Sequence, residues 1–162
     1  MGLESGDDQT LLAMHKWGDS ATIVSQATRV RRAGINLFVT VILGLAGKER
    51  SLIHARRTGE ALTAMQPDKV GALSLMVVPG TPLDVAIREG RFTLPNSREV
   101  LLELRTMLAH TAMDRGYFYA NHASNYLPLR VKMPRDKEAA IAEIDRALAG
   151  ARPLRPEWMR GL

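Results

Sequence analysis

The sequence contains no cysteine among its 162 residues. This absence excludes disulfide bonds, thiolate nucleophiles and cysteine-ligated zinc or iron–sulfur centres built from this chain alone. The most apolar stretch, residues 35–45, is far shorter than the roughly 20 residues of a membrane-spanning helix. The N-terminus also lacks the basic and then apolar pattern of a secretory signal. We therefore expect a cytoplasmic protein with no membrane partner.

The residues that are present are typical of a folded domain. Hydrophobic residues make up 46% and charged residues 24% of the chain, close to the average for globular proteins, and the length suits a single unit. Lys and Arg number 22 against 17 Asp and Glu, a net charge of +5. The cations are spread along the chain, so solvated surfaces are favoured over a stripe that binds nucleic acid.

Strand-like and helix-like patterns alternate along the chain. Residues 35–43 and 70–78 are rich in β-branched residues and nearly continuously apolar, as in strands covered on both faces. Residues 2–6 look like the end of another strand, and 117–120 form a short aromatic candidate. Helices are predicted between them, beginning near Asp7, Ser20, Ser51, Leu83, Asn96 and Pro134. This order predicts an α/β fold with a parallel sheet.

Three polar or glycine-containing segments follow predicted strands: Glu4–Ser5, Gly44–Glu49 and Pro79–Pro82. The carboxyl ends of parallel strands share one edge, so we expect these segments to converge there. Glycine at 44 lets a ligand approach the backbone. Lys48 follows only a G-x-x-G spacing, which is not a phosphate-binding loop, so a nucleoside triphosphatase is not expected.

The same segments resemble strand ends of a known family. GLESGDD at 2–8, VILGLAGKE at 41–49 and LMVVPGTPL at 75–83 are similar, in order and spacing, to the fourth, fifth and sixth strand ends of radical S-adenosylmethionine enzymes. ANHASNYLPL at 120–129 and RPEWMRGL at 155–162 resemble an iron–sulfur oxidoreductase-like subgroup. The sequence departs from the family pattern at Thr40, where the family has glycine, and at 46–48, which reads Ala-Gly-Lys in place of Pro-Gly-Glu.

The resemblance implies an incomplete parallel (β/α) barrel, the C-terminal portion of a radical SAM partial TIM barrel, over residues 1–130. A C-terminal helix and extended tail follow over 131–162. It implies S-adenosylmethionine as cofactor, bound across the open rim. The cofactor-binding residues implied by the resemblance are Glu4, Ser5, Ile42, Gly44, Met76, Val77 and Val78.

The family binds a [4Fe-4S] cluster through three cysteines, CxxxCxxC, after its first strand. This chain has none, so the resemblance implies no catalytic or metal-ligating residue here and a truncated form inactive by itself. It also implies the missing N-terminal half-barrel as a partner, with Met1 an internal methionine. A narrow parallel sheet would in any case have unpaired edges and one uncovered face.

Two alternatives remain open. The first is a non-catalytic basic α/β module that binds RNA or a partner protein through the basic tail and the loop around His122. The second, an independent α/β enzyme, lacks a nucleophile–base pair at recognisable spacing. We expect the His122 loop to be held by its own hydrogen bonds, His54 to be a partly exposed helix residue, and Trp158 and Met159 to attach the tail to the body.

Overall fold

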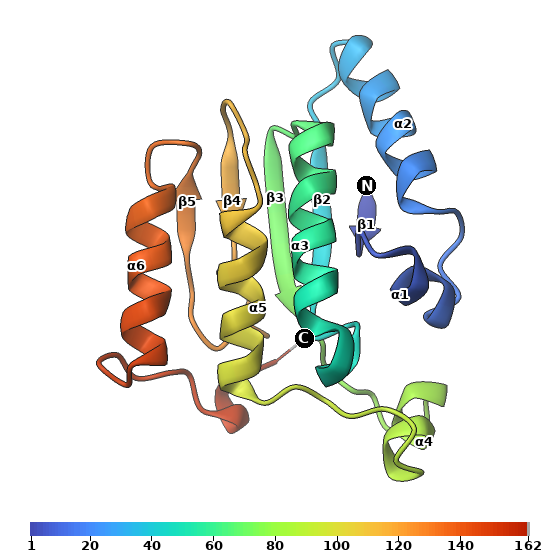
Figure 1. Ribbon diagram of the computed structural model, residues 1–162, viewed down its shortest axis with the longest axis vertical. Helices are drawn as coiled ribbons and strands as arrows, with labels where there is room; N and C mark the ends of the chain where they lie inside the picture. The colour runs from blue at the N-terminus through green and yellow to red at the C-terminus, as the bar shows by residue number, and fades with distance from the viewer. Residues whose placement is uncertain (162) are drawn as a thin grey trace.

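The computed structural model describes residues 1–161, which form an α/β fold around a five-stranded sheet (Figure 1). The strands lie in chain order: β1 (Gly2–Glu4), β2 (Phe38–Leu43), β3 (Lys69–Ser74), β4 (Tyr117–Tyr119) and β5 (Arg130–Lys132). β1 to β4 are parallel, and β5 runs antiparallel to β4. The predicted class, α/β with a mainly parallel sheet, is confirmed.

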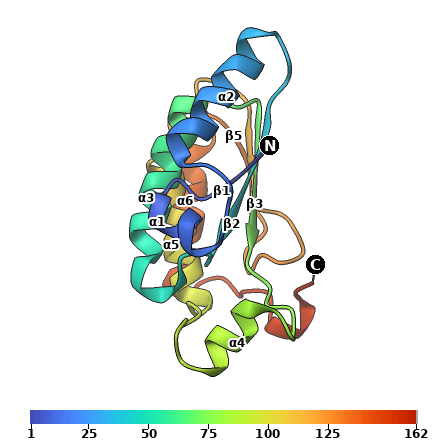
Figure 2. The ribbon, with the colours of Figure 1, turned by 90° about the vertical axis from the view of Figure 1, so that its right-hand side faces the viewer.

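Helices cover one face of this sheet. They are α1 (Asp8–Ala13), α2 (Ser20–Arg32), α3 (Gly47–Met65), α5 (Ser97–Ala109) and α6 (Lys137–Leu148), whereas α4 (Pro82–Arg88) and the short 3₁₀ turn η1 (Glu157–Met159) lie beyond the carboxyl ends of the strands. In the side view, the described residues that lie on the opposite face belong to the β4–β5 loop and the C-terminal tail (Figure 2). Within residues 1–161, no helix has the length and apolarity needed to cross a bilayer.

Buried and more exposed side chains alternate along β2, which shows how the two faces of the sheet differ. Val39, Val41 and Leu43 point toward the helices and are at most 1% exposed, while Phe38 on the other face is 50% exposed. The continuous apolar run had predicted burial on both faces, which is wrong for this sheet. The uncovered face expected of a narrow sheet is present.

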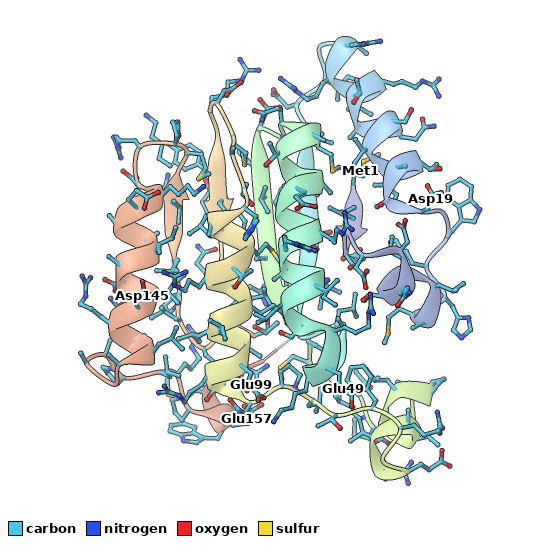
Figure 3. All side chains as sticks on the ribbon, viewed as in Figure 1. Met1, Asp19, Glu49, Glu99, Asp145 and Glu157 are labelled. Carbon is cyan, nitrogen blue, oxygen red and sulfur yellow. The ribbon has the colours of Figure 1, made fainter. Side chains whose placement is uncertain are left out.

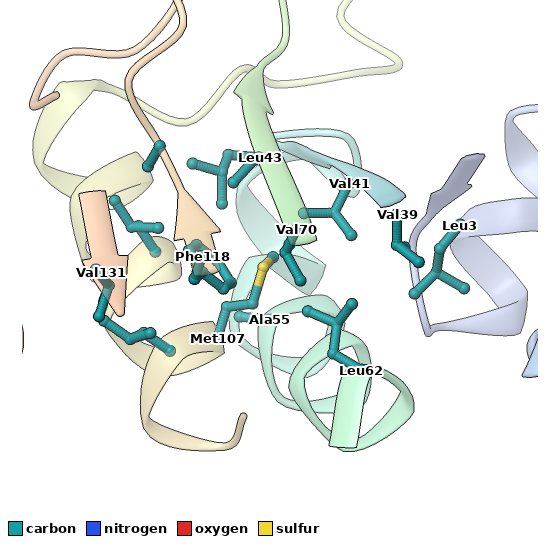
Figure 4. Packing of buried hydrophobic residues seen from close by; sticks show 14 of the residues in the cluster. Leu3, Val39, Val41, Leu43, Ala55, Leu62, Val70, Met107, Phe118 and Val131 are labelled. Atoms are coloured by element: carbon teal, nitrogen blue, oxygen red, sulfur yellow. The ribbon is translucent and has the colours of Figure 1, made fainter. Parts of the chain in front are cut away.

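The core lies between the sheet and the helices α3 and α5 (Figure 4). Val70 and Phe118 from the sheet meet Leu62 and Met107 from the helices, and all four are at most 1% exposed. Gly59 allows the two helices to approach closely, because a Cβ there would lie 2.6 Å from the carbonyl oxygen of Met107. The two helices therefore pack closely together over the sheet.

Two of the predicted helix caps are confirmed. Asp7 caps α1, and Asn96 forms a capping box with Glu99 at the start of α5. Three predicted starts are wrong: Asp19 rather than Ser20 caps α2, α3 begins at Gly47 rather than Ser51, and α6 begins at Lys137. Pro134 lies in the turn before α6, where Asp136 accepts a hydrogen bond from the Lys132 amide.

The strand β5 was not predicted, because Arg-Val-Lys is too short to show a strand pattern. The domain boundary predicted after residue 130 falls inside this strand. β5 pairs with β4, and α6 packs on α5. Residues 131–161 therefore continue the same sheet and helix layer.

The turn after β1 is held by an ion pair between Asp7 and Arg50 of α3, at 2.9 Å. Burial by itself raises the pKa of Asp7, but hydrogen bonds from Arg50 and Thr10 and the charge of Arg50 outweigh it, so the pKa lies below its ordinary value. A carboxylate of lowered pKa stabilises the fold above the unfolded pKa, and this stabilisation is lost as pH falls through the folded value.

We predict that Asp7→Asn lowers the free energy of unfolding by about 1 kcal/mol at neutral pH, since solvent screens part of the ion pair. The difference from the parent protein shrinks below about pH 4, where the unfolded carboxyl is protonated. Urea titrations at a series of pH values measure it. Asp114→Asn, an exposed control, changes stability by less than about 0.5 kcal/mol. A difference that stays constant down to pH 3 would contradict this account.

Candidate functional site

A cavity of about 380 Å³ lies at the carboxyl ends of β2 and β3. This volume is near the lower end of the range for small-molecule sites, roughly 300–1,000 Å³. We call it the β2–β3 cavity. Its lining comes from both strand ends, from the segment before α5, from the β4–β5 loop and from the tail: Leu43, Gly44, Ser74, Leu75, Met76, Val77, Leu94, Pro95, Val100, Tyr126, Glu157 and Arg160.

The cavity brings together three of the predicted cofactor-binding residues, Gly44, Met76 and Val77. Ile42 lies two residues before Gly44, half-buried and outside the lining, with Leu73 as its register partner. Val78 also lies outside the lining and is 46% exposed. The convergence of the β2 and β3 ends is therefore observed, although it does not include every residue of the two strings.

Glu4 and Ser5, at the end of β1, do not line the cavity. Glu4 forms an ion pair with Lys16 at 3.3 Å. Ser5 is fully buried, and its hydroxyl lies 2.7 Å from Nδ1 of His54. A ligand-binding role for either residue stays a prediction, and in Ser5 the hydroxyl is already engaged inside the protein.

The backbone after β3 offers free hydrogen-bonding groups beside the cavity. The Leu75 amide donates to the Leu43 carbonyl at 2.9 Å, which extends the β2–β3 pairing past the strand. Beyond it, the amides and carbonyls of Met76 and Val77 form no hydrogen bond with any of the residues that the structure describes. Apolar walls with a few free backbone groups are typical of sites for flat heterocyclic ligands.

The turn that forms the floor of the cavity is held by a buried carboxylate. Gly44 has φ +82°, a conformation that favours glycine. Its amide donates to Oε1 of Glu103 at 2.6 Å, and the Ser51 hydroxyl donates to Oε2 of the same carboxylate. Glu103 comes from α5 and is 0% exposed. One side chain of the helix layer therefore positions the β2 turn.

His54 extends this network to β1. Its Nδ1 contacts Ser5, its Nε2 lies 3.4 Å from Oε1 of Glu103, and the residue is 0% exposed. The expectation of a partly exposed histidine was wrong, because this side of α3 packs under the β1 turn. A serine, a histidine and a carboxylate in series have the composition of a hydrolase triad. Ser5 has no exposed surface, however, so the arrangement is a structural link between β1, α3 and α5.

The C-terminal tail closes one side of the cavity through Arg160, whose side chain is only 5% exposed. The guanidinium donates to the carbonyls of Ser124 at 2.6 Å and Leu75 at 3.2 Å, and lies 4.0 Å from the ring centroid of Tyr126. The expected attachment by Trp158 and Met159 was wrong, since they are 82% and 53% exposed. An arginine, rather than an apolar anchor, holds the tail.

Tyr126 and Glu157 complete this attachment. Burial and the hydrogen bond to Glu157 raise the pKa of Tyr126 to about 12, although the charge of Arg160 acts in the opposite direction. The phenol therefore stays neutral at physiological pH and donates to Glu157 at 2.7 Å. In Figure 3 the labelled Glu157 and Glu99 lie close to the same end of the molecule, where α5 begins.

The loop around His122 is held by its own hydrogen bonds, as predicted: the Ser124 amide donates to His122 Nδ1 at 3.2 Å. Ser124 and Asn125 also bind the end of β3. The Ser74 amide donates to the Ser124 hydroxyl at 3.0 Å, and the Asn125 side-chain amide donates to the Ala72 carbonyl at 2.8 Å. The loop thus replaces β4 as the neighbour of β3 beyond Tyr119.

Sequence reasoning missed Glu103 and Arg160. A signal for Glu103 was present, because it lies on the apolar side of its helix with Val100, Leu104 and Met107, where a carboxylate must find buried partners. Arg160 has one partner close in sequence, Glu157, but its other partners lie 34 to 85 residues away, so the sequence does not mark it as the residue that holds the tail. No group of three or more His, Asp or Glu within 1–161 is arranged to hold a metal ion.

We predict that Glu103→Leu lowers the free energy of unfolding by about 3 kcal/mol or more, because it leaves the Gly44 amide and the Ser51 hydroxyl buried without acceptors. Glu103→Gln, which keeps one acceptor, costs less. The amide of Gly44 also loses protection from hydrogen exchange in Glu103→Leu. Glu138→Leu, on the exposed first turn of α6, is the matched control and changes stability by about 0.5 kcal/mol. An equal decrease in the free energy of unfolding in Glu103→Leu and Glu138→Leu would disprove the stabilising role of the Glu103 hydrogen bonds.

Comparison of the chain with models of known protein families finds no match, and a search of curated proteins finds none either. The likeness of the strand-end strings to radical S-adenosylmethionine enzymes therefore stays a hypothesis.

Proposed function

We propose that this chain forms the nucleoside-binding side of a radical S-adenosylmethionine-type partial barrel, with the β2–β3 cavity as the pocket for the adenosine part of the cofactor. One observation carries the proposal. Two of the three strings that resemble the family, at 41–49 and 75–83, contribute Gly44, Met76 and Val77 to one cavity. The pocket thus forms where parallel α/β sheets bind their ligands, at the carboxyl ends of adjacent strands.

The chemistry of the lining fits an adenine base. Leu43, Leu75 and Leu94 supply apolar contact for the faces of the ring. The free backbone groups of Met76 and Val77 can donate to and accept from its edge. A volume of about 380 Å³ suits a nucleoside better than the complete cofactor, so we expect the methionyl part to extend beyond the cavity.

In the family, the cofactor is cleaved reductively at a [4Fe-4S] cluster. This chain has no cysteine and therefore supplies no thiolate ligand for such a cluster. The ligands would come from an N-terminal half-barrel, whether it precedes this sequence or belongs to another polypeptide. The edge of β1 that pairs with no other strand among residues 1–161 is the surface that such a half-barrel would extend, in a cytoplasmic enzyme of the oxidoreductase-like subgroup.

We predict that adenosine, S-adenosylhomocysteine and S-adenosylmethionine bind with dissociation constants within about five-fold of each other, because only the nucleoside is held. The constants should be on the order of 0.1–1 mM, a typical affinity for a ligand of this size in a partly open site. Saturation-transfer NMR and calorimetry measure them. Guanosine, whose edge has a different donor and acceptor pattern, should bind at least about five-fold more weakly.

Leu94→Trp places an indole in the cavity and should abolish adenosine binding. The same substitution at Leu12, which is 77% exposed on α1, is the matched control and should leave binding unchanged. Thermal unfolding of both variants checks that they fold. Absence of adenosine binding at 5 mM, or equal binding by both variants, would refute the proposed pocket.

A further inference from the structure

The uncovered face of the sheet carries a cluster of aromatic and basic side chains near the amino ends of its strands. Strand register places Phe38, Lys69, Tyr117 and Lys132 in one row across β2 to β5, and Thr40, Gly71, Tyr119 and Arg130 in the next row of the same face. We call Phe38, Lys69, Tyr117, Tyr119, Arg130 and Lys132 the sheet-face patch. It lies at the end of the sheet opposite the β2–β3 cavity.

The aromatic rings of this patch form a stacking platform. The rings of Tyr117 and Tyr119 stack on each other, with centroids 5.6 Å apart and planes 14° apart. Phe38 lies over Gly71, where its ring carbons are about 3 Å from the position that a Cβ would take. Half of the surface of Phe38 is exposed, so flat apolar surface is offered to solvent in the middle of the open face.

The cations of the patch are free to bind an anion. The guanidinium of Arg130 lies 5.1 Å and 5.8 Å from the Tyr117 and Tyr119 ring centroids. Lys69, Arg130 and Lys132 are exposed, and none of the three forms an ion pair with a carboxylate in the described part of the chain. The acidic neighbours are engaged elsewhere: Asp68 pairs with Arg115, and Asp136 pairs with Arg135.

The basic tail is less suited to nucleic acid than this face. Arg155 donates to the carbonyls of His122, Ala123 and Asn125. Arg160 is buried under Tyr126 and Glu157, and Arg152 pairs with Glu143. The arginines of the tail therefore hold the tail and the β4–β5 loop, while Lys69, Arg130 and Lys132 of the sheet-face patch form no ion pair with any described residue.

We propose that the sheet-face patch binds single-stranded RNA, with bases stacked on the tyrosine pair and Phe38 and with phosphates bound by Lys69, Arg130 and Lys132. Open sheets that combine exposed aromatic rings with nearby cations bind unpaired bases in this way, because stacking is tolerant of sequence and the cations follow the backbone. Positive charge on the patch matches the charge of the ligand and argues against a second copy of the same face. The proposal is independent of the nucleoside pocket.

The test uses a fluorescent single-stranded RNA of about 12 nucleotides, a length within the usual site size of such surfaces. Fluorescence anisotropy should show binding that weakens about ten- to twenty-fold between roughly 50 and 200 mM salt, as expected for about three phosphate contacts. Arg130→Glu with Lys132→Glu should weaken binding at least about ten-fold. Arg56→Glu with Arg57→Glu on α3, an equal change of charge on the helix side, should weaken it less than about two-fold.

Stacking is tested separately from charge. Tyr117→Ala and Tyr119→Ala should each weaken binding about five-fold or more, whereas Tyr119→Phe, which keeps the ring, should bind as the parent does. Adenosine should not displace the RNA, so failure of the nucleoside pocket and failure of this proposal can be told apart. Thermal unfolding checks each variant, and Tyr119→Phe remains informative if an alanine variant does not fold.

Several results would overturn the proposal. An equal loss of RNA affinity in the two charge-reversed double variants would show a non-specific effect of net charge. Unchanged RNA affinity in both alanine variants, or equal affinity for duplex RNA, would show that bases do not stack on the two tyrosines. A dimer in sedimentation that Arg130→Glu with Lys132→Glu dissociates, together with no RNA binding at about 50 mM salt, would show that this face joins two copies of the chain.

Discussion

A hydrogen bond from the Gly44 amide to the buried carboxylate of Glu103 connects the two layers of this protein where its cavity forms. The turn after β2 needs a left-handed glycine, and its amide, pointing into the protein, needs an acceptor. Glu103 supplies the acceptor from α5, and the same carboxylate binds Ser51 and lies beside His54. Because a buried carboxylate is costly without partners, these groups are held together, and the floor of the β2–β3 cavity is fixed by the helix layer.

Helices cover one face of the sheet, and the rest of the sheet presents two regions of different chemistry, one at each end of the strands. At the carboxyl ends, the strands give way to irregular backbone, and the β4–β5 loop and the tail close around an apolar cavity. At the amino ends, nothing in residues 1–161 covers the open face, and aromatic rings lie beside unpaired cations. A nucleoside pocket and a surface for single-stranded RNA therefore belong to opposite ends of one sheet, and each can be lost without the other.

Local chemistry explains which features could be predicted. Asp7 and Asn96 cap helices through their own side chains, and Gly44, Met76 and Val77 directly follow long strands, so sequence position predicts where they lie. Ser5 shows the limit: it also follows a strand, but its direction depends on His54, which is 49 residues away. The strand β5 has three residues and exists because β4 offers an edge. Arg160 attaches the tail to carbonyls whose position depends on how the β4–β5 loop folds.

The sequence alone predicts the order of β1 to β4 and of the α-helices, the caps at Asp7 and Asn96 and the segments that follow β2 and β3, because these depend on neighbours within a few residues. It also determined, through the absence of cysteine, that no thiolate ligand for a metal cluster comes from this chain. Tertiary packing, in contrast, pairs β5 with β4, buries Glu103 and His54 beside each other and brings the tail to the cavity. These outcomes depend on contacts between residues far apart in the sequence, whose energy exists only once the sheet has formed.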